Sequence, residues 1–126
     1  MENLNSEQVK KLADDFMKMA NALGNYRYEH FEDLSSEENL KFKELHSLTL
    51  SKTTELYTKA AVLVMEDVQI SLDKIETITV ETQELYMKLN NVQHILDRAT
   101  SVLTLATSII SLDVKAIGAS LTGLIT

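Results

Sequence analysis

Residues that could bind a metal ion or transfer a proton are concentrated in one short stretch of the chain. It supplies three carboxylates and one imidazole, from Glu29, His30, Glu32 and Asp33. Carboxylate and imidazole groups are ligands for divalent cations. Such side chains are mostly exposed to solvent, so we expect a solvated acidic turn here. No metal ion and no cofactor is predicted.

Sequence patterns of common catalytic sites are absent. A di-iron carboxylate bundle needs Glu-x-x-His pairs, but the residues three positions before the three histidines are Arg27, Lys43 and Asn91. Only Gly24 precedes Gly118, so there is no glycine-rich phosphate loop, and no serine lies in a G-x-S-x-G turn. The chain has no cysteine, which excludes disulfides and thiolate chemistry. We therefore expect a protein that is not an enzyme.

The charge balance argues against nucleic acid as a partner. Nineteen acidic residues against twelve basic ones give a net charge of -7, which repels a phosphate backbone. The N-terminal residues lack the basic start and apolar core of a secretory signal. We expect a cytoplasmic protein by default. Export by a route that needs no signal peptide is the alternative.

The elements that carry these residues are predicted to be helices. The chain contains no proline, and from Asn25 to Ile117 it contains no glycine, so neither strong helix breaker interrupts this span. A length of 126 residues suits one compact domain. The sequence predicts a single all-α domain over residues 1–126, an elongated helical bundle or coiled coil with a short N-terminal helix and then one very long helix or a helical hairpin.

The N-terminal helix has clear start and stop signals. Asn5 and Gln8 have the spacing of a capping box, and Gly24 is a natural C-terminal stop. Between them, apolar residues recur at steps of three and four, as on one face of a helix: Val9, Leu12, Ala13, Phe16, Met19, Ala20 and Leu23.

An aromatic connector is predicted to follow, and a second capping box, Ser35 with Glu38, then starts the next helix. The connector carries Tyr26, Tyr28 and Phe31. Aromatic rings usually serve as core, so we expect them to plug the end of the bundle. An exposed recognition loop is the alternative.

A seam with a 3.5-residue period runs from Tyr57 to Ile110. It is typical of a coiled coil or bundle, and its main apolar members are Val64, Val68, Ile75, Ile78, Leu85, Leu89, Val92, Leu96, Leu103 and Ile110. The β-branched run at 77–82 is the best place for a hairpin turn. The unbroken phase instead favours one continuous helix. The rest of the chain could cover only part of the apolar seam of so long a helix, so we expect self-association into a homo-oligomer.

The last segment, 99–126, contains only two charged residues, Asp113 and Lys115. Its uncharged run is shorter than the roughly 20 residues that span a bilayer, yet it is apolar on nearly every side of a helix. Its candidate partner or membrane face comprises Val102, Leu105, Ile109, Leu112, Ile117 and Leu121. We expect this segment to fold back on the bundle.

The leading interpretation of the sequence is a non-enzymatic interaction and assembly protein that self-associates through the seam. The alternative is a membrane-active or pore-forming-like helical protein that uses its apolar C-terminal segment. A membrane is the second choice of partner, after a second copy or another protein.

Overall fold

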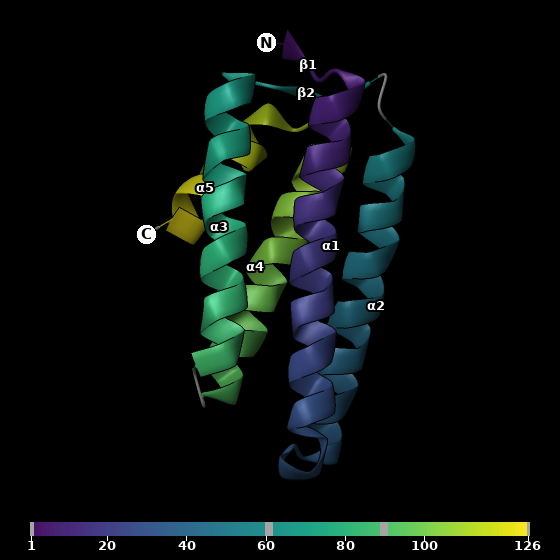
Figure 1. Ribbon diagram of the computed structural model, residues 1–126, viewed down its shortest axis with the longest axis vertical. Helices are drawn as coiled ribbons and strands as arrows, with labels where there is room; N and C mark the ends of the chain where they lie inside the picture. Colours follow the sequence, from purple (N-terminus) through teal and green to yellow (C-terminus); the bar gives the residue numbers. More distant parts are fainter. Residues whose placement is uncertain (1, 60–61, 89–90, 126) are drawn as a thin grey trace.

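The computed structural model describes residues 2–59, 62–88 and 91–125, and it confirms the all-α prediction (Figure 1). Two strands of two residues each pair in antiparallel fashion, Glu2 with Met65 and Asn3 with Val64. The elements are, in order, β1 (Glu2–Asn3), α1 (Ser6–Glu29), the short 3₁₀ turn Phe31–Asp33, α2 (Ser36–Thr58), β2 (Val64–Met65), α3 (Val68–Lys88), α4 (Val92–Ile110) and α5 (Val114–Ile125).

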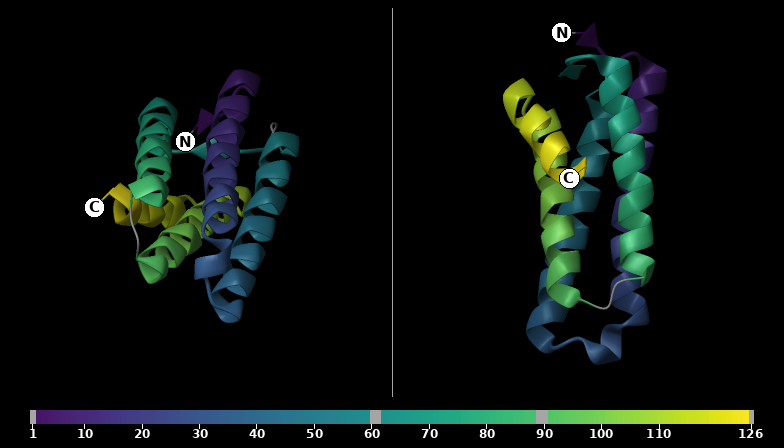
Figure 2. Two further views of the ribbon diagram at one scale, coloured as in Figure 1. Left: turned by 60° about the horizontal axis from the view of Figure 1, so that its bottom comes forward. Right: turned by 90° about the vertical axis from the view of Figure 1, so that its left-hand side faces the viewer.

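The helices form an elongated bundle in which α1 packs against α2 and α3, and α4 packs against α2. α3 and α4 touch little, and α5 packs against both of them (Figure 2). The core has two clusters. One joins the first half of α1 to α3, α5 and the end of α4, and the other lies near the α1–α2 connection and contains Tyr26, Phe42 and Tyr86.

Both predicted capping boxes are confirmed. The Gln8 backbone N–H donates to the Asn5 side chain at 2.8 Å, and the Gln8 side chain accepts from the Asn5 N–H at 2.9 Å. Ser35 and Glu38 make the same reciprocal pair at 3.1 and 2.8 Å. The predicted apolar stripe of α1 is buried along its whole length.

The prediction of a short first helix that stops at Gly24 is wrong, because α1 continues to Glu29. Gly24 lies inside the helix, where α2 approaches closely. A Cβ atom at this position would lie 2.8 Å from Nε2 of His46 and 3.0 Å from its Cε1. The glycine therefore makes room for a side chain of the neighbouring helix.

The prediction of one continuous helix over 57–110 is also wrong. α2 ends at Thr58, β2 follows, and α3 and α4 are separate helices. α4 begins with its own cap, because the Asn91 side chain accepts from the His94 N–H at 3.0 Å. A 3.5-residue period shows which face of each helix is buried. The same period can continue across a break between two helices, because both helices pack into one core.

A turn at 77–82 does not form either, since α3 runs through it. The buried side chains of Ile78, Thr79 and Thr82 hold this run in the helix. The hydroxyl of Thr79 donates to the carbonyl of Ile75 at 2.8 Å, so this buried polar group finds its partner within its own helix. Tertiary packing here overrides a weak local preference.

Candidate functional site

The most distinctive surface of the molecule lies where α1 turns into α2. α1 is capped at its C-terminal end by the His30 N–H, which donates to the Tyr26 carbonyl at 3.0 Å. The side-chain amide of Asn39 donates back to the carbonyls of Phe31 at 3.3 Å and Leu34 at 3.4 Å. Together with the capping box of α2, these bonds hold the turn in one conformation. We call residues 26–38 the hairpin end.

The three aromatic residues of the hairpin end lie in different surroundings. Tyr26 is buried, and its ring stacks on His30 with centroids 4.2 Å apart and lies 5.4 Å from that of Phe42. Tyr28 and Phe31, by contrast, are 84% and 53% exposed. The predicted aromatic plug is therefore wrong for these two residues. α1 continues to Glu29 and carries Tyr28 on its exposed face, and Phe31 lies exposed in the 3₁₀ turn that follows.

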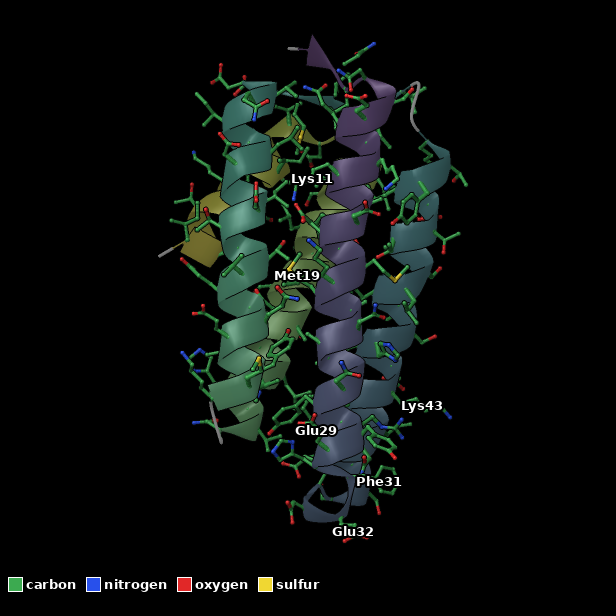
Figure 3. All side chains as sticks on the ribbon, in the orientation of Figure 1. Lys11, Met19, Glu29, Phe31, Glu32 and Lys43 are labelled. Carbon is green, nitrogen blue, oxygen red and sulfur yellow. The ribbon has the colours of Figure 1, made fainter. Side chains whose placement is uncertain are left out.

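The exposed rings of Tyr28 and Phe31 border an open cavity of ≈ 1140 Å³. Figure 3 shows Glu29, Phe31 and Glu32 at this end of the bundle. The cavity is lined by Asn21, Gly24, Asn25, Arg27, Tyr28, Glu29, Phe31, Glu32, Asp33 and His46. Its wall thus comes from α1, the 3₁₀ turn and one residue of α2.

The cavity rim is acidic. Within the described part of the chain, the carboxylates of Glu29, Glu32 and Asp33 form no ion pair. The cation beside them is Arg27, whose guanidinium carbon lies 5.4 Å from the Phe31 ring centroid. Its Nε is buried and has no hydrogen-bond partner among the described residues. The hairpin end therefore offers aromatic faces and unpaired carboxylates side by side.

Burial perturbs two titrating groups at this site. Burial, and then the charge of Arg27, lowers the pKa of His46 below its usual range. Burial raises the pKa of Tyr26, and the carboxylates of Glu38 and Asp33 add to the shift. A neutral His46 against Gly24 and a neutral Tyr26 in the core are thus the forms favoured by the fold.

No metal centre accompanies these groups. Across residues 2–59, 62–88 and 91–125, no three His, Asp or Glu side chains come together as a group able to hold a metal ion. The exposed groups around the cavity are aromatic rings and carboxylates.

The predicted seam is divided between two helices and the segment before them. Its buried members are Val68, Ile75, Ile78 and Leu96, and its partly buried members are Val64, Leu85, Val92, Leu103 and Ile110. Leu89 lies outside the described residues. α1 and α5 help to cover the buried members within one chain, and self-association through the seam stays a prediction.

The predicted partner or membrane face is largely interior. Val102, Leu105, Ile109, Ile117 and Leu121 are buried, while Leu112 is 41% exposed. The apolar C-terminal segment folds back on the bundle, as predicted. No helix in the described part of the chain is long and apolar enough to cross a membrane.

A residue that the sequence reasoning missed fastens this segment. Arg98 donates from Nε to the Thr82 hydroxyl at 2.9 Å and from its terminal nitrogens to the Leu124 carbonyl at 2.9 Å and the Ile78 carbonyl at 3.3 Å. Burial lowers its pKa. The available signal was its position, the last charge before a long uncharged run.

The comparisons with known proteins found no matching family model, no similar curated protein and no similar solved structure.

Proposed function

We propose that this protein is a non-enzymatic helical interaction protein, and that its hairpin end binds a basic segment of a partner protein. The observation that carries the proposal is the exposure of Tyr28 and Phe31 beside the cavity at the hairpin end. Exposed aromatic rings at a structured turn are costly to leave in water. They are also the residues enriched where proteins meet.

The charges around the rings select the kind of partner. Residues 29–38 carry five carboxylates and no lysine or arginine. Glu37 is paired with Lys41 at 3.5 Å, but Glu29, Glu32 and Asp33 are unpaired in the described structure. An arginine or lysine side chain of a partner suits both the carboxylates and the rings. Its positive charge can pair with the carboxylates, and its flat or aliphatic part can pack on the rings. Arg27 already makes such a contact within the chain, over the Phe31 ring.

The hairpin end is also prepared for binding by its rigidity. The cap at Tyr26, the bonds from Asn39 and the second capping box fix the turn before a partner arrives. A fixed surface loses little conformational entropy on association, so more of the contact energy is kept as affinity.

The experiment uses a fluorescent peptide of alternating arginine and alanine as the probe, with a peptide of alternating glutamate and alanine as its counterpart. Binding of each to the full chain is followed by fluorescence anisotropy at low and high salt. We expect the basic peptide alone to bind, and added salt to weaken it. Replacing Tyr28 and Phe31 together with serine should weaken binding about tenfold or more, from the roughly 0.5–2 kcal/mol of each cation–aromatic contact.

Ile70→Ser is the matched control. Ile70 is 56% exposed on α3, outside the hairpin end, so this variant also removes an exposed apolar side chain. It should bind the probe like the parent chain. Equal binding by the double variant, or equal binding of the acidic peptide, would show that the hairpin end is not the basic-partner site.

A further inference from the structure

The connection between α4 and α5 is short and strained. Only residues 111–113 separate the two helices, and Leu112 adopts a φ of 58°. This left-handed conformation places Cβ of an L residue too close to a carbonyl oxygen, which makes it unfavourable for leucine. Burial offsets little of this cost, because the Leu112 side chain is 41% exposed.

The apolar pattern of α4 continues in phase into α5. The positions Leu103, Ala106, Ile110, Ile117, Leu121 and Leu124 follow one another at steps of three, four, seven, four and three. If residues 111–113 became helical, α4 and α5 would join into one helix from Val92 to Ile125, roughly 50 Å long. Its apolar stripe would be continuous.

The surface that receives α5 is built by α3 and α4. Ile117, Leu121 and Leu124 belong to the same buried cluster as Ile75 and Ile78 of α3 and Val102 and Ile109 of α4. Arg98 then fastens the far end of α5 through the Leu124 carbonyl. None of these contacts depends on which chain supplies α5, since the receiving groups lie on α3 and α4.

We propose that two copies of this chain exchange their α5 helices. In the exchanged dimer, residues 111–113 are helical, and each α5 occupies the α3–α4 surface of the other copy. Every docking contact is kept while the left-handed strain at Leu112 is removed from both chains. This is an interaction surface for a second copy, and it is independent of the hairpin end.

The test compares two hinge variants of the full chain by light scattering, from micromolar to millimolar protein. Leu112→Gly removes the strain of the left-handed turn and makes the joined helix less stable. It should therefore lower the association constant of the dimer at least about tenfold. Asp113→Ala removes the carboxylate that accepts from the Ala116 N–H at 3.1 Å at the start of α5, and alanine favours the joined helix. It should raise the constant about fivefold or more.

Asp67→Gly is the matched control. Asp67 is the other described non-glycine residue with a positive φ, 44°, and it precedes α3 rather than α5. Relief of strain there should leave the dimerisation constant unchanged. Small-angle scattering should also show the joined helix as a longer maximum dimension of the dimer than two side-by-side copies would have.

Three results would overturn the proposal. The parent chain and Asp113→Ala could both stay monomeric at millimolar concentration. A dimer could form equally in both hinge variants, as expected for two bundles that meet face to face. Asp113→Ala could remain monomeric and float with phosphatidylglycerol vesicles, which would assign the released α5 to a lipid surface instead.

Discussion

Replacing Arg98 with alanine tests how α5 is held on the bundle. The guanidinium links three helices, with two bonds of 2.9 Å to Thr82 and Leu124 and one of 3.3 Å to Ile78. A hydrogen bond to a charged group contributes roughly 1.5–3 kcal/mol. The three bonds share one side chain and part of their energy offsets the desolvation of the cation, so we expect a loss of about 2–4 kcal/mol in the free energy of unfolding.

Urea unfolding followed by circular dichroism measures this loss as a lower midpoint at an unchanged slope. Arg98→Lys keeps the charge but cannot span three acceptors, so it should fall between the parent chain and Arg98→Ala. Hydrogen exchange should accelerate in α5 before it does in α1. Arg27→Ala is the control, because Arg27 lies over the half-exposed Phe31 ring and makes no hydrogen bond through its Nε among the described residues; such a cation–aromatic contact is worth about 0.5–1 kcal/mol. A loss below about 0.5 kcal/mol for Arg98→Ala would refute the idea that this residue fastens α5.

Two further predictions concern single contacts. Gly24→Ala should stabilise a His46→Ala chain by up to about 1 kcal/mol, the helix preference of alanine over glycine. In the parent chain the same change should be less favourable, because the new Cβ would lie 2.8 Å from the His46 ring and the ring would have to shift. Urea midpoints of the four chains measure both changes, and an equal change in the two backgrounds would contradict the prediction. Tyr57→Phe removes the hydroxyl that donates to Asp14, and that hydrogen bond, followed by the one from Lys10, lowers the pKa of Asp14. A carboxyl group whose pKa is lowered on folding stabilises the fold above its unfolded-state pKa, and this stabilisation is lost as the pH falls through its folded-state pKa. The free energy of unfolding of the parent chain should therefore exceed that of Tyr57→Phe by about 0.5–1 kcal/mol at neutral pH and by less in acid. An equal difference at pH 6 and at pH 2.5 would count against the bond.

The start of each long helix could be predicted because its cause is local. The residues of each capping box lie three positions apart, so the sequence contains the whole interaction. The apolar stripe of α1 could be predicted for the same reason, because the helical period places its members on one face, whichever helices pack against that face. The absence of proline and the scarcity of glycine sufficed for the all-α class.

The candidate site was only partly predictable. The sequence identified the aromatic connector and left an exposed loop as the alternative. It could not show that Tyr26 is buried whereas Tyr28 and Phe31 are exposed. That separation depends on where α1 ends, and it ends at Glu29 rather than at Gly24. The extra turns place Tyr26 against Phe42 in the core and rotate Tyr28 outward.

The sequence by itself determined which faces of the helices are apolar and where two helices begin, because these depend on residues a few positions apart. Only the tertiary structure decided where the 57–110 seam is broken, which surfaces cover it, and why a glycine lies inside α1 opposite His46. The physical reason is that periodicity is a property of one helix, whereas breaks, close approaches and the hold of Arg98 on α5 depend on contacts between residues far apart in the chain.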